Sequence, residues 1–235
     1  VSTMVDAPHD AIQTQKTAIR RIALARRDAM PQELRAAKSD RIATVALDYL
    51  DERLAHPDGD GEQDTAATAP CPTPSSKTPI VAAFWSFGSE VDTRPIIAGI
   101  VARGWRLALP CMVRTSQTHP SQRTVATMRF LEVPAHRLDE AASLFAAKPI
   151  RSHSADEPWM AAFPAVPVPD IDAFVVPLVA YDDDGNRLGY GGGNYDRVLP
   201  LASPDATVVG VAFAEQRVTS VPMSEYDVRI PVISA

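Results

Sequence analysis

The chain has 235 residues, 46% of them hydrophobic, so it is long enough to bury a substantial core as one large domain. Its formal net charge of −6 argues against a general nucleic-acid-binding protein, because such proteins usually gather basic residues on one face. We expect a single domain over residues 1–235 and a small-molecule partner.

The cysteines and the hydropathy pattern indicate the compartment. Cys71 and Cys111 show neither a C-x-x-C spacing nor a disulfide framework, which favours a reduced setting. The first thirty residues lack the apolar run of a signal peptide, and no stretch approaches about 20 uninterrupted apolar residues. We therefore expect a cytoplasmic protein that has no membrane span and is not secreted, and we expect it to be a monomer.

Two helices are predicted at the start of the chain. No helix breaker interrupts an amphipathic pattern from about Asp10 to Met30, and Pro31 ends this helix or opens the next. In the second helix, apolar residues recur at i, i+3, i+4, i+7 and i+8 and should face the core: Ile42, Val45, Ala46, Tyr49 and Leu50. Residues 57–79 follow, and their richness in Pro, Gly and Thr is typical of a surface insertion.

Strand and helix signals alternate in the rest of the chain. The run Ile80–Trp85 is apolar, and Thr93 with Pro95 is typical of the N-cap and first turn of a helix that ends near Gly104. Further β-compatible runs cover residues 106–109, 128–131, 173–178 and 207–213, with a possible edge strand near 228–233. The Pro-rich residues 158–169 should form an extended connection. This alternation predicts an α/β fold of three layers, α/β/α, with a mostly parallel central sheet.

The most informative segment runs from Asn186 to Arg197 and reads N-R-L-G-Y-G-G-G-N-Y-D-R. It lies between a predicted strand and a predicted helix, and glycines without a Cβ let backbone N–H groups approach a phosphate closely. It matches neither the Walker A loop, which needs Gly-Lys-Ser/Thr, nor the Rossmann fingerprint, which needs glycine where Asn194 stands. The alternative to a phosphate loop is a tight turn that serves only geometry.

This segment resembles the signature of the 5-formyltetrahydrofolate cyclo-ligase family, also called 5,10-methenyltetrahydrofolate synthetase. The resemblance continues in order and spacing along the chain, through Lys16-x-x-x-Arg20, Ser89-Glu90-Val91-Asp92-Thr93, Leu109-Pro110, Glu157-Pro158, Val211-Ala212-Phe213-x-x-Gln216 and Asp227. It implies an α/β fold related to sugar-phosphate isomerases and CoA transferases. It also implies the activity, which is the ATP- and Mg²⁺-dependent closure of 5-formyltetrahydrofolate to 5,10-methenyltetrahydrofolate with release of ADP and phosphate.

The resemblance also implies which residues form the site. ATP contacts are implied for a basic pair and for the glycine-rich segment: Lys16, Arg20, Arg187, Leu188, Gly189, Tyr190, Gly191, Gly192, Gly193, Asn194 and Tyr195. Folate contacts are implied for Trp85, Glu90, Tyr190 and Tyr195, and Mg²⁺ ligation for Asp196 and Asp227. Lys16 and Arg187 are the expected catalytic cations, because phosphoryl transfer depends on neutralising developing charge.

Plainer structural interpretations remain for several of these residues. Lys16 and Arg20 lie four residues apart on one helix face, which a solvated basic face would also show. Trp85 could be a core residue, Glu90 could be an exposed acid before a helix, and Asp196 could cap its own helix.

Two positions depart from the family pattern. Asn194 stands where many relatives carry a tyrosine, and Gly192 stands where some carry a lysine. Because fold alone does not fix chemistry, two other functions stay open. One is a sugar-phosphate isomerase or CoA transferase-like enzyme, and the other is a non-catalytic regulator that binds a nucleotide or a folate.

Overall fold

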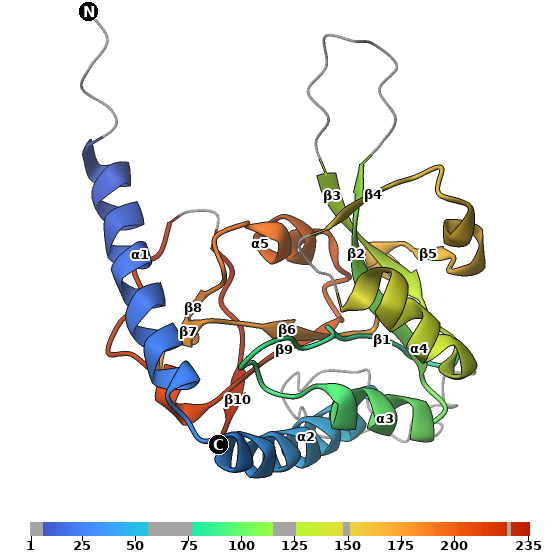
Figure 1. Ribbon diagram of the computed structural model, residues 1–235, viewed down its shortest axis with the longest axis horizontal. Coiled ribbons are helices and arrows are strands. Elements are labelled where there is room, and N and C mark those ends of the chain that lie inside the picture. Colours follow the sequence, from blue (N-terminus) through green and yellow to red (C-terminus); the bar gives the residue numbers. More distant parts are fainter. Residues whose placement is uncertain (1–6, 56–76, 115–125, 148–150, 225–226) are drawn as a thin grey trace, which may run out of the picture.

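The computed structural model describes residues 7–55, 77–114, 126–147, 151–224 and 227–235. Its centre is an eight-stranded sheet (Figure 1). The strands of this sheet are β1 (Ile80–Ala82), β2 (Arg106–Arg114), β3 (Ala126–Glu132), β4 (Ser152–Ser154), β5 (Ala165–Val166), β6 (Ala173–Pro177), β9 (Thr207–Ala212) and β10 (Val232–Ser234). They lie in the order β10-β9-β6-β1-β2-β3-β5, and β4 pairs with β2.

The sheet is mostly parallel, as predicted. Only the pairings of β2 with β3 and of β3 with β5 are antiparallel. Two further strands, β7 (Ala180–Tyr181) and β8 (Arg187–Leu188), form a separate antiparallel hairpin. The sequence predicted β1, β2, β3, β6, β9 and the edge strand β10, but it did not predict β4, β5, β7 and β8, which are each two or three residues long.

Helices lie on both faces of the sheet. The α-helices are α1 (Ala7–Asp28), α2 (Gln32–Ala55), α3 (Arg94–Ala102), α4 (Leu138–Ala141) and α5 (Asn194–Val198), and α4 continues as a π-helical turn over Ala142–Ala146. Figure 1 shows α2 and α3 below the sheet and α5 above it. The predicted α/β fold with helical layers on both sides is therefore confirmed. Within the described ranges, no helix is long and apolar enough to cross a membrane.

Alternate residues of the central strands enter two different hydrophobic clusters. In β1, Val81 packs in the cluster under α2 and α3, whereas Ile80 and Ala82 pack in the cluster under α5. Phe174 and Val175 of β6 divide in the same way. Because both faces of the sheet are covered, these strands are continuous apolar runs rather than alternating ones.

The helix boundaries follow recognisable signals. Pro31 opens the second helix, since its carbonyl accepts the amide of Arg35 at 3.0 Å. Gly104 ends α3 with a left-handed φ of 72°, and the amides of Gly104 and Trp105 bond back to Val101 and Ile100. This is the glycine C′ stop that the sequence predicted.

Two expectations about side chains were wrong. Of the predicted stripe of α2, Ile42, Ala46 and Leu50 are buried as expected, but Val45 is 53% exposed. The buried face of α2, which packs on α3 and β9, is completed by Ser39 and Ala43 instead. Thr93 stands at the N-cap position of α3 but makes no side-chain capping bond. Its hydroxyl instead donates to the carbonyl oxygen of Phe84 and accepts the amide of Ser86.

The Pro-rich stretch also differs from expectation. Instead of one extended connection, 3₁₀ turns form over Pro158–Ala162 and Val168–Asp170, on either side of β5. Proline fixes φ near the value that such turns require, which suits it to their first positions. Most of the predicted insertion at 57–79 lies outside the described residues.

Candidate functional site

A cavity of about 1000 Å³ brings together every residue that the sequence analysis assigned to the site. These residues are Lys16, Arg20, Trp85, Glu90, Arg187, Leu188, Gly189, Tyr190, Gly191, Gly192, Gly193, Asn194, Tyr195, Asp196 and Asp227. They come from α1, the loop after β1, the hairpin strand β8, the glycine loop (residues 189–193), α5 and the segment before β10. Figure 1 shows α1 on one side and strands β2 and β3 on the other, with α5 between them.

The glycine loop needs glycine for its backbone. Gly191 and Gly193 have φ values of 99° and 61°, a region that other residues enter only with strain. No backbone hydrogen bond from the amides of Gly191, Gly192 or Gly193 is made within the described residues. These amides are therefore available as hydrogen-bond donors. The helix that follows, α5, is only five residues long, so its dipole adds less than a full helix would.

Helix α1 directs two cations towards the glycine loop and Asp227. The Lys16 side chain is 5% exposed, and its Nζ lies 2.5 Å from Oδ2 of Asp227. Arg20 Nε donates to the carbonyl oxygen of Gly189 at 2.8 Å. Burial lowers the pKa of Arg20, although the Asp227 carboxylate acts in the opposite direction. This pair is therefore not a solvated basic face.

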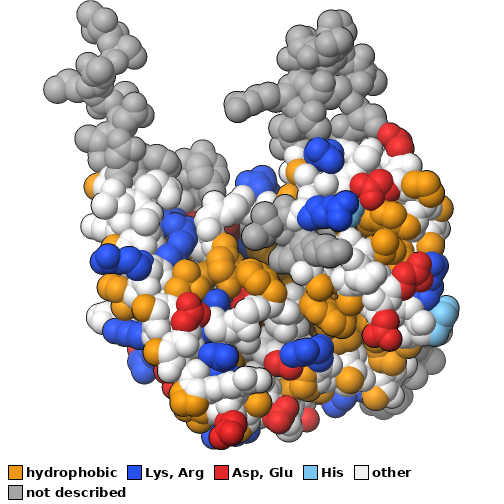
Figure 2. All heavy atoms as spheres, in the orientation of Figure 1, with side chains coloured by type: hydrophobic (Ala, Val, Ile, Leu, Met, Phe, Trp, Pro, Cys, Tyr) orange, Lys and Arg blue, Asp and Glu red, His pale blue; other side chains and the backbone are white. Residues whose placement is uncertain are grey.

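The position of α1 depends on apolar contacts with the β7–β8 hairpin. Ala23 is fully buried in a cluster with Val179, Ala180, Leu188 and Val221. This cluster is separate from the two that cover the sheet. In Figure 2, hydrophobic side chains gather in the middle of the face, and Lys and Arg side chains flank them on the α1 side.

The two acids expected to bind Mg²⁺ are each paired with a cation. Arg187 Nη2 lies 2.6 Å from Oδ1 of Asp196, and Arg187 is 5% exposed. Oδ2 of Asp227 accepts Lys16 and both the amide and the hydroxyl of Ser224. Burial opposes the charge of Asp227, but these hydrogen bonds hold its pKa below the usual value.

The donor set can accept a hard cation. The bonds described above occupy one oxygen of each carboxylate, Oδ1 of Asp196 and Oδ2 of Asp227. Among the described residues there is no cluster of three or more His, Cys, Asp or Glu side chains of metal-binding type. Mg²⁺ needs no such cluster, because it takes one or two carboxylates together with phosphate oxygens and water.

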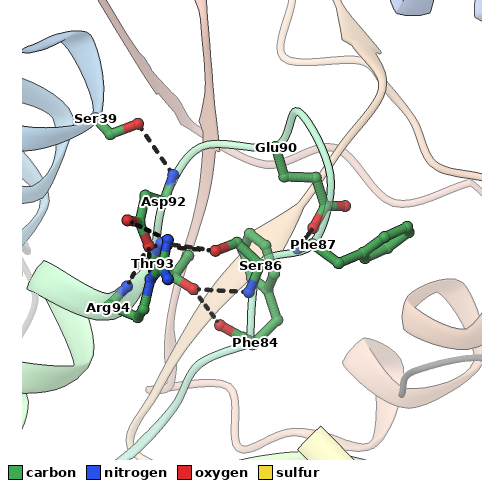
Figure 3. Close-up of polar contacts among 8 residues, drawn as sticks. All are labelled: Ser39, Phe84, Ser86, Phe87, Glu90, Asp92, Thr93 and Arg94. Carbon is green, nitrogen blue, oxygen red and sulfur yellow. Dashed lines mark hydrogen bonds and ion pairs between the residues drawn. The ribbon is translucent and has the colours of Figure 1, made fainter. Parts of the chain in front are cut away.

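Glu90 is held by an ordered loop between β1 and α3 (Figure 3). Its Oε2 accepts the amide of Phe87 at 2.9 Å. The loop is closed at its base by Thr93, which bonds to Phe84 and Ser86, and it is tied to α2 by a 3.0 Å bond from the amide of Asp92 to Ser39 Oγ. The Glu90 carboxylate is therefore anchored before any ligand enters.

Glu90 also bridges to the glycine loop. Its Oε1 accepts the hydroxyl of Tyr190 at 2.8 Å, across 100 residues of sequence. The ring of Tyr190 lies 5.9 Å from that of Phe87, and the Arg27 guanidinium lies over its face at 5.8 Å. Burial raises the pKa of Glu90 despite these hydrogen bonds and the positive charge of Arg27. Burial and the Glu90 charge likewise raise the pKa of Tyr190.

Trp85 is both a packing residue and a residue of the cavity wall. The side chain packs against the cluster under α2 and α3, and it also lines the cavity. Tyr195 behaves similarly, since it packs against the cluster under α5 and faces the same cavity.

Sequence reasoning missed one wall of the cavity. This wall comes from β2 and β3 and consists of Pro110, Cys111, Met112 and Met128. Of these residues the sequence placed only Met128 in a predicted strand, because the predicted run 106–109 ended before Pro110. Periodicity also does not reveal which strand ends meet. Burial raises the pKa of Cys111 to about 12, so its thiol stays protonated at neutral pH.

Two residues of the resembling pattern have structural partners outside this cavity. Glu157 accepts Trp159 Nε1 at 2.6 Å and the amide of Ser154 at 2.9 Å. These bonds hold the pKa of Glu157 at about 2 in spite of burial. Gln216 donates to the carbonyls of Leu178 and Val179 and so ties η6 (Ala214–Gln216) to the end of β6.

Comparison with known proteins gives consistent results. The sequence pattern of the 5-formyltetrahydrofolate cyclo-ligase family matches residues 63–235. The 5-formyltetrahydrofolate cyclo-ligase of Escherichia coli K12 is 33% identical over 154 residues, which cover 65% of this chain and 75% of that protein. The enzyme of the same name from Haemophilus influenzae is 27% identical over 150 residues, covering 63% and 71% of the two chains.

Two solved structures share the fold. A 5,10-methenyltetrahydrofolate synthetase from Mycoplasma pneumoniae aligns with a TM-score of 0.60 and 16% identity over 93% of this chain and 97% of that one. The Aquifex aeolicus 5,10-methenyltetrahydrofolate synthetase aligns with a TM-score of 0.54 and 20% identity over 93% and 89%.

The matched region begins after α1, so the positions of Lys16 and Arg20 at the site rest on the geometry described above. The glycine loop, Glu90 and Asp227 all lie inside the matched residues. The chain therefore belongs to the 5-formyltetrahydrofolate cyclo-ligase family and is an enzyme of the ligase class.

Proposed function

We propose that this enzyme converts 5-formyltetrahydrofolate to 5,10-methenyltetrahydrofolate in a reaction that consumes ATP, requires Mg²⁺ and releases ADP and phosphate. The observation that carries this proposal is one cavity that joins the glycine loop, the cations of α1 and the anchored carboxylate of Glu90. A nucleotide and a second ligand can therefore meet without crossing bulk solvent.

The phosphates of ATP fit the end of the cavity formed by the glycine loop. Free amides of the loop and the cations Lys16, Arg20 and Arg187 surround it. Two of these cations are buried, so they face an anion in a poorly solvated setting where charge interactions are strong. We assign Lys16 and Arg187 to neutralising the charge that develops during phosphoryl transfer.

Asp196 and Asp227 would hold Mg²⁺ against the phosphates. When bound, this ion would offset the negative charge of the phosphates. The cations that pair with these acids are the same ones that we assign to the phosphates. Lys16 and Arg187 can thus exchange a carboxylate for a phosphate without leaving the site.

The folate fits the region near Glu90. A carboxylate with two oxygens suits the adjacent N–H donors of a pterin ring, and the anchored loop presents it in a fixed orientation. Trp85, Tyr190 and Tyr195 offer aromatic surface to a flat ring. The ligand would displace the Tyr190 hydroxyl from Oε1 of Glu90.

The proposed chemistry needs no protein nucleophile. The formyl oxygen of the substrate attacks the γ-phosphate, and ADP leaves. N10 of the folate then attacks the activated formyl carbon, and the N10 proton departs with the phosphate to leave the methenyl bridge. Catalysis then consists of holding the two substrates in line and stabilising phosphoryl charge.

The test is an assay with purified enzyme, ATP, Mg²⁺ and 5-formyltetrahydrofolate, which should produce the methenyl chromophore and an equal amount of ADP. We expect Glu90→Ala and Asp196→Ala to lower kcat/KM by about 100-fold or more, because each removes a charged contact. The matched control is Glu52→Ala, which changes an exposed acid on α2. Wild-type enzyme that makes no ATP-dependent product, or that turns over sugar phosphates without ATP, would contradict the proposal.

A further inference from the structure

The glycine loop is clasped at both ends by an arginine. At one end Arg20 Nε donates to the carbonyl oxygen of Gly189 at 2.8 Å. At the other end Arg197 Nη2 donates to the carbonyl oxygen of Gly192, also at 2.8 Å. Arg20 belongs to α1 and Arg197 belongs to α5, so the two contacts come from different helices.

Asn194 fixes the direction of the second arginine. Its Oδ1 accepts a hydrogen bond of 2.6 Å from Nη2 of Arg197, which stands three positions later in the chain. Arg197 Nη1 lies so close to Gly193 that a Cβ built there would stand 3.1 Å from it. The guanidinium therefore lies close against the bare backbone of the loop, and its bonds to Gly192 and Asn194 use the same nitrogen.

The charge of Arg197 is not neutralised by a carboxylate among the described residues. Lys16 and Arg187 each have an acidic partner, Asp227 and Asp196, whereas within the described segments no ion pair involves Arg197. Its Nε and Nη1 groups make no hydrogen bond to the described residues, and the side chain lines the cavity. An oriented, unpaired guanidinium beside free loop amides is a site for an anion.

We propose that Arg197 is a further phosphate-binding residue of this cavity and that Asn194 is its positioning residue. Arg197 binds a phosphate oxygen of the nucleotide through donors that Asn194 and Gly192 leave free. Asn194, which departs from the family pattern, contributes a carbonyl that holds the guanidinium in place. This inference rests on the proposed ATP site.

The test compares steady-state kinetics of the wild-type enzyme with Arg197→Gln and Arg197→Lys. Glutamine keeps hydrogen-bond donors for the Gly192 carbonyl but has no charge, whereas lysine keeps the charge. We expect Arg197→Gln to raise the KM for ATP by about 10- to 100-fold, the effect of losing a charged hydrogen bond, and to leave the KM for the folate unchanged. Arg197→Lys should recover part of that loss.

Asn194→Ala provides a second variant in which the guanidinium itself is kept. We expect it to raise the KM for ATP by less than Arg197→Gln does, because the cation remains but is less well oriented. Arg41→Gln, which changes an exposed arginine on α2, is the control and should leave both KM values unchanged. Thermal unfolding of each variant shows whether it folds.

The outcomes separate this inference from the proposed function. If the wild type makes ATP-dependent product but Arg197→Gln keeps the wild-type KM for ATP, the role of Arg197 is wrong and the function stands. Equal losses in the glutamine and lysine variants, or equal rises in both KM values, would show a purely structural clasp. A wild type without ATP-dependent product would overturn both.

Discussion

At the scale of single residues, two carboxylates of one cavity are tuned in opposite directions. Asp227 receives a buried lysine and two bonds from Ser224, and its pKa is lowered. Glu90 receives a hydroxyl and an amide but no cation in direct contact, and burial raises its pKa. Asp227 therefore stays charged over a wide pH range, whereas the surroundings of Glu90 disfavour its charged form.

This difference predicts how Glu90 affects stability. Because its folded-state pKa lies above the unfolded value, the stability that Glu90 contributes is present at low pH and is lost as pH rises through the folded-state pKa. We expect Glu90→Gln to match the wild type near pH 4 and to be the more stable protein near pH 7, on either side of the ordinary glutamate pKa of about 4.3. Urea unfolding at both pH values measures this, with Glu52→Gln as the control.

A Glu90→Gln variant that is less stable than the wild type at neutral pH would contradict this prediction. It would mean that the bonds from Tyr190 and Phe87 outweigh the cost of burying the charge. Activity should fall in either case, because an amide presents only one acceptor to the paired N–H groups of a pterin.

At the scale of elements, the glycine loop combines two kinds of glycine. Gly193 requires a left-handed backbone, with φ at 61°, and stands directly against Arg197. Gly192 has no positive φ, and a Cβ there would make only an ordinary contact of 3.4 Å with Asn194. Neighbouring glycines of the loop therefore differ in how well they tolerate a side chain.

We expect Gly193→Ala to lower the free energy of unfolding by about 1 to 2 kcal/mol and to raise the KM for ATP, because the added methyl strains the backbone and displaces Arg197. Gly192→Ala is the matched control and should change stability by less than about 0.5 kcal/mol. Chemical denaturation and steady-state kinetics of both variants give the comparison. Equal effects at the two positions would show that the backbone conformation does not decide the tolerance.

At the scale of the whole molecule, the sequence predicted those parts whose signal is local. The longer strands were recognisable as apolar runs, and both N-terminal helices were recognisable by apolar residues at a helical spacing. Short strands such as β7 and β8 carry too few residues for any period to show. The strand order, and the apolar wall that Met112 and Met128 add to the cavity, depend on contacts between distant segments and could not be derived.

In the candidate site, too, contiguous patterns could be predicted from the sequence, whereas contacts between distant segments could not. The glycine loop was recognisable as a contiguous pattern of twelve letters, Asn186 to Arg197. The spacing of Lys16 and Arg20 placed them on one helix face but did not say that this face turns inward. That depends on tertiary contacts such as the packing of Ala23 against the β7–β8 hairpin.

This packing predicts the effect of undocking α1. Ala23→Asp would bury a charge in an apolar cluster, which costs several kcal/mol unless the helix moves away. We expect α1 to detach, the KM for ATP to rise at least about 10-fold as Lys16 and Arg20 leave the cavity, and the sheet to persist. Limited proteolysis within α1 and far-UV circular dichroism report these two structural effects.

Ala25→Asp introduces the same charge at an exposed position of α1 and is the control. It should leave proteolysis and kinetics unchanged. If Ala23→Asp instead keeps the wild-type KM for ATP, the cations of α1 do not contribute to nucleotide binding.

The contacts that α1 makes with the site also have a kinetic consequence. The bonds from Lys16 to Asp227 and from Arg20 to Gly189 join residues 211 and 169 positions apart, so they close very long loops. Contacts of this range form late, because the entropy of closing the loop is lost before the contact returns any energy. During synthesis α1 emerges from the ribosome long before its partners on the β7–β8 hairpin exist, and its apolar face stays exposed until they appear. The proposed nucleotide site is thus completed only when α1 has met the glycine loop and Asp227.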